Sequence, residues 1–223
     1  MKDFLDALAP NNDLISRKGY HWALGTLMIV SLSLGWKYPV LGYVVPITMI
    51  AGIIGGASKG RIVCGNFCPR GTFLDTFFQV VANNRPIPQF LFTPAFRWTV
   101  MGLMMGFMVY RIAQNPTDPM HWGMVFWTMC LATTLLAFVL GIAYRSRSWC
   151  AFCPVGTMAN AIGGHKYQFS IASSCTTCGT CEKSCPMGFS IKEYRSDIFP
   201  NRDCLKCSSC EASCPKQAIS FPD

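Results

Sequence analysis

The sequence predicts a mainly α-helical membrane protein, in which a four-helix transmembrane bundle precedes a small α+β domain at the C-terminus. Three observations support this class. The chain of 223 residues is 51% hydrophobic and only 13% charged, well below the charged share of a typical soluble domain. The charge is unevenly placed, since residues 1–165 hold 12 Lys/Arg and 5 Asp/Glu, whereas residues 166–223 hold 7 and 6. Finally, the 13 cysteines fall into regularly spaced groups.

The change in composition predicts a domain boundary near residue 165. We expect a cytoplasmic N-terminal segment at 1–19, a four-helix transmembrane domain at 20–165 and a separate domain at 166–223. The net charge of +8 does not indicate a nucleic-acid partner, because no basic helix or recognised nucleic-acid-binding motif accompanies it. The expected surroundings are instead a membrane and other proteins.

Four apolar segments are candidates for spanning helices, because a spanning helix needs about 20 apolar residues. The third of them is short and lies between Arg97 and Arg111, whose long side chains are able to reach the lipid head groups. The four segments are Tyr20–Trp36, Tyr38–Ser58, Trp98–Tyr110 and Pro119–Tyr144.

The basic residues predict the orientation, because cytoplasmic loops carry an excess of Lys and Arg. In residues 1–165, only Lys37 and Arg111 fall on one side of the four spans, and the other basic residues fall on the opposite side. We therefore expect a multi-pass protein of the cytoplasmic (inner) membrane. Its N-terminus and its C-terminal domain are both expected in the cytoplasm.

The membrane part contains an internal repeat. The segment Gly60–Thr72 resembles Ser146–Thr157, and each follows a helical hairpin and contains a cysteine pair that ends in Cys-Pro. Because each copy has two spans, the copies are expected to be parallel hairpin repeats with both cysteine loops at the cytoplasmic face. After the first loop, the apolar stretch Phe73–Ala82 predicts a helix at the membrane interface.

The strongest motif is a doubled cysteine run near the C-terminus. Each run has the spacing Cys-x2-Cys-x2-Cys-x3-Cys-Pro, which is typical of bacterial ferredoxins with two [4Fe–4S] clusters; the fourth cysteine of each run ligates the other cluster. Zinc sites and disulfides match this spacing poorly. The predicted ligands of the first cluster are Cys175, Cys178, Cys181 and Cys214. The predicted ligands of the second are Cys204, Cys207, Cys210 and Cys185.

The cysteines of the two membrane loops have three interpretations. Four thiols in two pairs are able to ligate a third iron–sulfur centre or another metal. They are also able to act as redox-active dithiols, because a Cys-x-x-Cys arrangement lowers the thiol pKa. Alternatively, each Cys-Pro turn only shapes the exit from its hairpin. The sequence leaves all three open for Cys64, Cys68, Cys150 and Cys153.

Other sulfur-bearing residues of the spans are interpreted as packing. Cys130 lies inside the fourth span, where a buried free cysteine behaves as a small hydrophobic residue. Methionines recur at helical spacing in the third span, and methionine commonly fills irregular apolar interfaces. These are Met101, Met104, Met105 and Met108.

Taken together, these motifs resemble those of the membrane-bound [4Fe–4S] polyferredoxins. That family is represented by the quinol-dehydrogenase subunit of periplasmic nitrate reductase, the C-terminal half of the nitrous-oxide reductase regulator and the oxidase-assembly protein of the cytochrome cbb3 system. The shared elements are the cysteine loops at 64–68 and 150–153 and the two-cluster module at 175–214. The second loop departs from the nitrate-reductase relatives, with two rather than three residues between its cysteines.

The resemblance implies an electron-transfer component of an oxidoreductase complex rather than a stand-alone enzyme. Such a subunit relays electrons between cytoplasmic donors, the quinone pool and a partner cytochrome, reductase or dehydrogenase. Quinone is therefore a candidate cofactor, and its site is unassigned because no Asp, Glu or Lys lies inside the spans. The alternative is a metal-handling or assembly factor that reduces copper or a maturing cofactor through the loop thiols.

Overall fold

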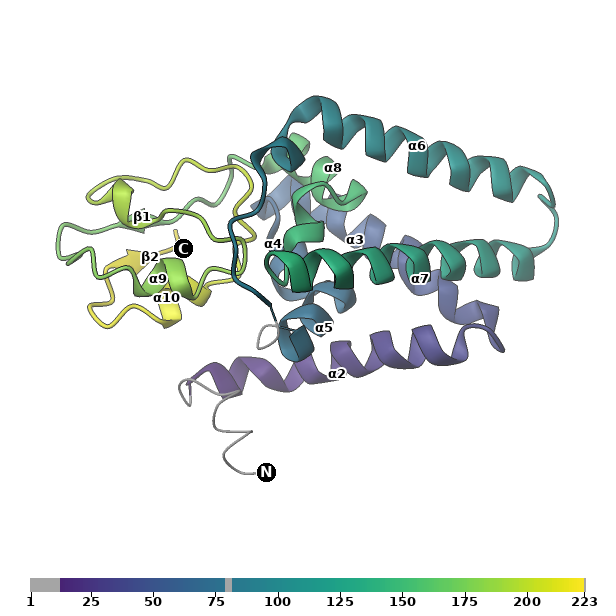
Figure 1. Cartoon of the computed structure of the whole chain (residues 1–223), viewed down its shortest axis with the longest axis horizontal. Helices are drawn as coiled ribbons and strands as arrows, with labels where there is room; N and C mark the ends of the chain where they lie inside the picture. Colours follow the sequence, from purple (N-terminus) through teal and green to yellow (C-terminus); the bar gives the residue numbers. More distant parts are fainter. Residues whose placement is uncertain (1–12, 79–81, 223) are drawn as a thin grey trace.

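The computed structural model describes residues 13–78 and 82–222. A group of helices forms the larger part, and a small C-terminal domain lies at one end of it (Figure 1). Residues 1–12 of the expected N-terminal segment lie outside the described residues, and α2 already begins at Asp13. The long helices are α2 (Asp13–Leu34), α3 (Val44–Lys59), α6 (Pro94–Ala113) and α7 (Pro119–Ala143).

Shorter elements connect the long helices and build the C-terminal domain. In the larger part they are η1 (Pro39–Tyr43), α4 (Ile62–Asn66), α5 (Pro69–Phe78), η2 (Gln89–Phe92), η3 (Ser148–Ala151) and α8 (Pro154–Gly163). In the C-terminal domain they are β1 (Ser170–Ile171), α9 (Thr180–Lys183), η4 (Lys192–Tyr194), α10 (Ser209–Ala212) and β2 (Ile219–Ser220).

Two helical stretches are long and apolar enough to cross a membrane. They are Pro39–Lys59, which comprises η1 and α3, and Pro119–Ala143, which is α7. These correspond to the second and fourth predicted spans. The apolar part of α2, Tyr20–Leu34, is shorter, and α6 is not among the described helices that pass the same test. The four-helix transmembrane bundle therefore stays a prediction.

Local sequence signals explain where the helices near the cysteine loops begin and end. The side chain of Asp118 accepts a hydrogen bond of 2.9 Å from the backbone N–H of Met120, and Pro119 occupies the first turn of α7; both are favoured helix starts. Helix α3 ends at Gly60, whose φ of 67° lies in the left-handed region that glycine tolerates. That turn directs the chain into the first cysteine loop.

The helix that follows each cysteine loop packs into the other helices. Helix α5 lies against α2, and α8 lies against α3 (Figure 1). On α3, a Cβ added at Gly56 would come within 2.9 Å of Ala159 Cα, so glycine allows the two helices to approach closely. Helix α5 covers the first part of the stretch Phe73–Ala82 that was expected at the membrane interface. Its Phe73 and Leu74 are buried and its Phe77 is exposed, and its place at a membrane interface stays a prediction.

The C-terminal domain is closed by its two short strands. Strand β1 pairs with β2 in antiparallel register, with Ser170 opposite Ser220 and Ile171 opposite Ile219. This pairing joins the beginning and the end of the domain around a core in which the rings of Phe169 and Phe199 stack with centroids 4.8 Å apart. The domain contains short helices and strands, as an α+β domain does.

Candidate metal centres

The two C-terminal cysteine runs fold alike. In each run the residue two positions after the first cysteine adopts a left-handed backbone, Thr177 with φ of 53° and Lys206 with φ of 54°. The residue four positions after the first cysteine also has a left-handed backbone, Gly179 with φ of 76° and Ser208 with φ of 56°. Left-handed residues bend the chain sharply. The third cysteine of each run then lies on a short helix, α9 or α10.

The structure brings the predicted ligands of the first cluster around one cavity. Its walls also include Thr176 to Thr180 and the apolar side chains of Ile171, Ile191 and Ile219. The fourth cysteine comes from the other run. The cysteines that line this cavity are Cys175, Cys178, Cys181 and Cys214.

A second cavity is lined by three cysteines of the second run and one cysteine of the first run. It is walled by Phe169, Met187, Phe189 and Phe199, which keep water away from the thiols. Its fourth cysteine again comes from the other run, directly before a proline. The cysteines that line this cavity are Cys185, Cys204, Cys207 and Cys210.

Both cavities suit a cubane cluster, because four cysteines from two segments of the chain line each of them. All 13 cysteines lie in the described part of the chain, where they are free thiols. Among the described residues, no three His, Cys, Asp or Glu side chains lie close enough together to hold one metal ion. Cysteines that surround a cavity from two segments of the chain match the ligation of a [4Fe–4S] cube, whose fourth ligand arrives from elsewhere in the sequence.

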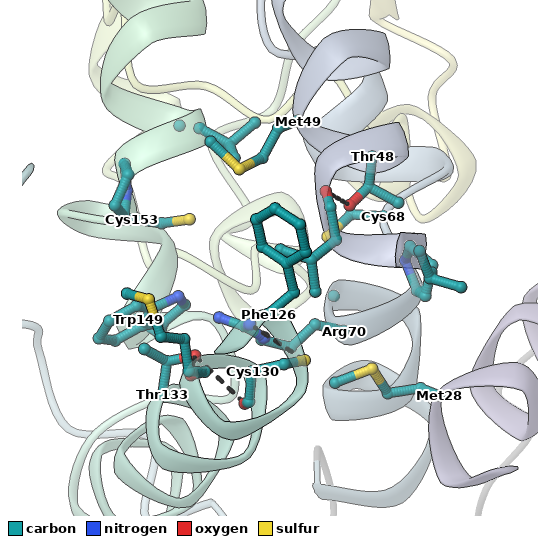
Figure 2. Close-up of a pocket in the computed structure, with 18 of the residues that line it drawn as sticks. Met28, Thr48, Met49, Cys68, Arg70, Phe126, Cys130, Thr133, Trp149 and Cys153 are labelled. Atoms are coloured by element: carbon teal, nitrogen blue, oxygen red, sulfur yellow. Dashed lines mark hydrogen bonds between the residues drawn. The ribbon is translucent and has the colours of Figure 1, made fainter. Parts of the chain in front are cut away.

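The four loop cysteines also share a cavity. It has a volume of about 130 Å³ and lies among α2, α3, α6 and α7. Figure 2 shows Cys68 and Cys153 on opposite sides of this cavity, with Phe126 and Arg70 between them. We call it the loop cavity. Its cysteines are Cys64, Cys68, Cys150 and Cys153, together with Cys130 of α7.

Each loop ends in a Cys-Pro step that starts a helix. Cys153 is the N-cap of α8 and Pro154 its first residue, and α5 likewise begins at Pro69, directly after Cys68. Proline is favoured at the first helical position. The positive end of a helix dipole stabilises negative charge, including a thiolate. The two helices therefore favour an anionic centre between Cys68 and Cys153.

Two buried arginines tie the loops to each other reciprocally. Arg61 lies three residues before Cys64, and it donates to the carbonyl oxygen of Cys150 in the other loop. Arg147 lies three residues before Cys150, and it donates to the carbonyl oxygen of Cys64 over 2.7 Å. The exposed fractions of Arg61 and Arg147 are 1% and 0%. The arginine of each repeat therefore fixes the loop of the other.

A glycine in each Cys-Pro-x-Gly segment makes room for these arginines. A Cβ at Gly71 would collide with the guanidinium of Arg147, and one at Gly156 would lie 2.6 Å from Nη2 of Arg61. Both glycines lie three residues after the second cysteine of their loop. At both positions glycine leaves space for a guanidinium, which would have to move if a side chain were added.

Burial dominates the acid–base behaviour of two loop thiols, those of Cys64 and Cys150. It raises the pKa of Cys64 to about 12, although Arg61 acts in the opposite direction. Burial also raises the pKa of Cys150, against the effect of Arg147. A redox-active dithiol needs a lowered thiol pKa. These surroundings therefore favour neutral thiols, or thiolates bound to a metal, over free nucleophilic thiolates.

The loops contact the half of the C-terminal domain that contains the second cavity. Arg145 donates to the carbonyl oxygen of Cys185 over 2.9 Å, and Asn66 donates to the carbonyl oxygen of Lys206 over 3.0 Å. A Cβ at Gly65 would strike the backbone oxygen of Leu205. Backbone atoms of the first loop and of the Cys204–Cys210 run are therefore in direct contact.

Two family models match the parts of the chain that contain these cysteines. A model of the 4Fe-4S binding domain matches twice, at residues 41–88 and 122–169, and a model of the 4Fe-4S dicluster domain matches residues 174–219. The chain carries 4Fe–4S ferredoxin-type domains. Each copy of the 4Fe-4S binding domain contains one cysteine loop and most of the apolar segment before it, so this part of the predicted internal repeat is supported. The parallel arrangement of two hairpins stays a prediction. The searches of curated proteins and of solved structures returned no match.

The matched domains contain all the cysteines that were predicted to bind clusters or metal. The dicluster domain spans both C-terminal runs and supports iron–sulfur clusters there. Sequence reasoning explained Arg61 and Arg147 by membrane orientation or by the stabilisation of thiolates nearby, and it missed that each arginine joins the two loops. It also gave no role to Asp75 and Asp203, which pair with these arginines at 2.7 and 3.1 Å. A signal was present, since each arginine precedes a loop cysteine by three residues.

Proposed function

We propose that this chain is a membrane-anchored electron-transfer subunit with three iron–sulfur centres in series. Its ferredoxin-type domains indicate an iron–sulfur electron-transfer role. A bound [4Fe–4S] cluster accepts and donates single electrons, while the protein positions it and tunes its potential. In the proposal, the centres lie in the loop cavity, in the cavity beside Cys207 and in the cavity beside Cys178.

The observation that carries the proposal is the continuity of buried packing from one cavity to the next. One core contains Cys64 and Cys150 of the loops together with Leu205, and Cys185 and Cys207 pack against it. A second core contains Cys181 and Cys210, which come from different C-terminal cavities. Shared cores hold neighbouring sites at fixed separations and exclude water between them.

The last cavity of the series is open to the solvent. Cys178 is exposed, whereas Cys181 and Cys210 are buried. Its side chain contacts Thr180 Oγ1 at 3.4 Å, and this contact lowers the pKa of the Cys178 thiol. We propose that this end exchanges electrons with a soluble cytoplasmic partner and that the loop cavity exchanges them with the membrane side.

We propose that a quinone head group binds at the membrane end of the loop cavity, beside the proposed centre. Ligand sites of this kind are mostly apolar with a few polar groups. Phe126, Trp127 and Leu32 contribute apolar walls, and Thr48 and Thr133 contribute hydroxyl groups. The loop cysteines line the same cavity, so a quinone there would lie next to the proposed loop centre. The quinone is part of the proposal and has no assigned hydrogen-bond donor.

A quinone-oxidation experiment tests the relay. The protein is placed in lipid nanodiscs without oxygen, reduced with dithionite and then separated from the excess dithionite. It is mixed with decylubiquinone while the absorbance of the clusters is recorded. We expect Cys64→Ser to keep both C-terminal clusters and to lose most of the rate of reoxidation. Ser33→Ala, at a position on α2 outside the loop cavity, is the matched control. Equal rates in Cys64→Ser and Ser33→Ala would overturn the relay.

The proposed membrane topology has its own test. Helices α3 and α7 are long and apolar enough to span, and we propose that α2 and α6 complete the bundle with both termini in the cytoplasm. An epitope inserted after Gln114 should be accessible only from the side opposite to an epitope at the C-terminus. Accessibility of both epitopes from one side would mean that α7 does not cross the membrane, which would overturn the proposed four-span bundle.

A second candidate function has one specific observation in its favour. Half of the twelve methionines of the chain line the loop cavity, and thioethers and thiols favour Cu(I). An assembly factor that reduces and holds copper would use them. Anaerobic titration with Cu(I) distinguishes the candidates, because a copper site requires stoichiometric binding that falls in Met105→Leu. The six methionines are Met28, Met49, Met104, Met105, Met108 and Met129.

A further inference from the structure

The two repeats differ at one pair of matched positions. Asp75 lies seven residues after Cys68, and Asn160 lies seven residues after Cys153. In the first repeat, Asp75 accepts two hydrogen bonds from Arg147, at 2.9 and 2.7 Å. In the second repeat, the matched residue is an amide, which carries no charge to pair with Arg61. The second repeat therefore lacks its own carboxylate.

The C-terminal domain provides a carboxylate at that place. The Asp203 carboxylate accepts a hydrogen bond from Nη1 of Arg61 at 3.1 Å and one from the side-chain amide of Asn160. Its other oxygen lies 2.8 Å from Nη2 of Arg97 on α6. Arg61 also donates to the backbone oxygen of Asp203 at 3.1 Å. Asp203 immediately precedes Cys204 of the second cavity.

We propose that Asp203 is a positioning residue that completes the loop site from the C-terminal domain. Asp203 takes the role that Asp75 has in the first repeat. Asn160 is uncharged, and its side-chain amide donates a hydrogen bond to the Asp203 carboxylate. The loop that holds Cys150 is then fixed only when the domain is docked, because Arg61 binds both the Cys150 carbonyl and Asp203. The redox consequences of this proposal rest on the proposed function.

Charge and burial explain why the contact is specific. Arg61 is 1% exposed and the Asp203 side chain 16% exposed, so water replaces a missing partner poorly. Removing one member of a buried ion pair leaves the other charge uncompensated. Loss of the Asp203 charge should therefore loosen the loops. It should also make electron uptake nearby easier, because a negative charge next to a centre opposes the addition of an electron.

Moving the carboxylate from position 203 to position 160 tests the proposal. Asp203→Asn removes the carboxylate, and Asp203→Asn combined with Asn160→Asp returns it next to Arg61 from the other side. Glu193→Gln, which removes an exposed carboxylate of the same domain, is the matched control. Full-length protein is used throughout, and EPR signals of the two C-terminal clusters verify folding.

Hydrogen exchange measures the docking independently of any iron in the loops. In Asp203→Asn, we expect exchange of backbone amides in 61–66 and 148–152 to rise about tenfold or more, because a buried guanidinium loses its partner. The double variant should recover most of this protection. Equal exchange in Asp203→Asn and Glu193→Gln, or no recovery in the double variant, would overturn the proposal.

The potential of the loop centre gives the second measurement. It should rise in Asp203→Asn, return towards the original value in the double variant and stay unchanged in Glu193→Gln. A general loss of structure would not restore the potential in the double variant. If the loops of the unmodified protein bind no iron, the proposed relay is wrong, and hydrogen exchange still decides whether Asp203 docks the domain.

Discussion

The guanidinium of Arg147 donates a 2.7 Å hydrogen bond to the carbonyl oxygen of Cys64, across the boundary between the two repeats. The same side chain is fully buried and forms an ion pair with Asp75 at 2.7 Å. One arginine of the second repeat therefore joins the first cysteine loop to α5. The positions of the loop cysteines depend on this contact and on its counterpart at Arg61.

Replacement of Arg147 tests the contribution of this contact to stability. Arg147→Ala should lower the free energy of unfolding by about 3 kcal/mol or more, because Asp75 and two backbone carbonyls lose a buried partner. Arg85→Ala, at an exposed position, should change it by less than about 0.5 kcal/mol. Denaturant unfolding in detergent, followed by tryptophan fluorescence, measures both. Similar effects of the two substitutions would contradict the account.

The glycines of the loops give a prediction about space. Gly71→Ala should weaken the loop site, since the added methyl group would occupy the place of the Arg147 guanidinium. Gly102→Ala on α6 is the control, because nothing lies within 4 Å of its added Cβ. Alanine should stabilise that helix by up to about 1 kcal/mol. Thermal unfolding of both variants separates steric conflict from helix propensity. An unchanged unfolding temperature in Gly71→Ala would argue against a fixed position of the Arg147 guanidinium.

Crossed ligation in the dicluster domain is tested by three alanine variants. If Cys214 serves the first cluster, Cys214→Ala should lose the same EPR signal as Cys178→Ala. Cys207→Ala should lose the other signal. Each variant should retain about four of the eight irons of this domain. A Cys214→Ala spectrum that matches Cys207→Ala would mean that each run ligates its own cluster.

Thiol reactivity tests the electrostatics of the loops. Burial raises the pKa of Cys64 to about 12, whereas the contact with Thr180 lowers the pKa of Cys178 below its usual value. In protein stripped of iron and still helical by circular dichroism, Cys178 should therefore hold at least about a thousandfold more thiolate at pH 8. Labelling of Cys64 by iodoacetamide should keep rising with pH beyond pH 9, where that of Cys178 levels off. Fast labelling of Cys64 at pH 8 would favour the dithiol interpretation.

The spacing of the C-terminal cysteines predicts two ligand sets, and the structure places each set around one cavity. Two identical runs, each followed by proline, leave few ways to surround two cubes. The second and fourth apolar segments were equally clear, and they agree with the two stretches that are long and apolar enough to span a membrane. Tyr20–Trp36 and Trp98–Tyr110 carried weaker signals, and their membrane placement stays a prediction.

The contacts that assemble the loop site were not predictable in the same way. Arg61 and Arg147 satisfy two constraints at once, and the positive-inside pattern alone already explained them. The packing of α5 against α2 joins distant parts of the sequence, which a local apolar pattern does not reveal. The ion pair between Arg61 and Asp203 joins positions 142 residues apart. Only comparison of the two repeats at Asp75 and Asn160 contained a hint of it.

The iron and acid-labile sulfide content of protein purified without oxygen tests the third centre directly. We expect about twelve irons per chain, eight from the dicluster domain and four from the loop cavity. Cys153→Ser should lower the content to about eight and leave the two interacting cubane signals in the EPR spectrum. About eight irons in the unmodified protein, with four loop thiols open to alkylation after unfolding, would contradict a third centre.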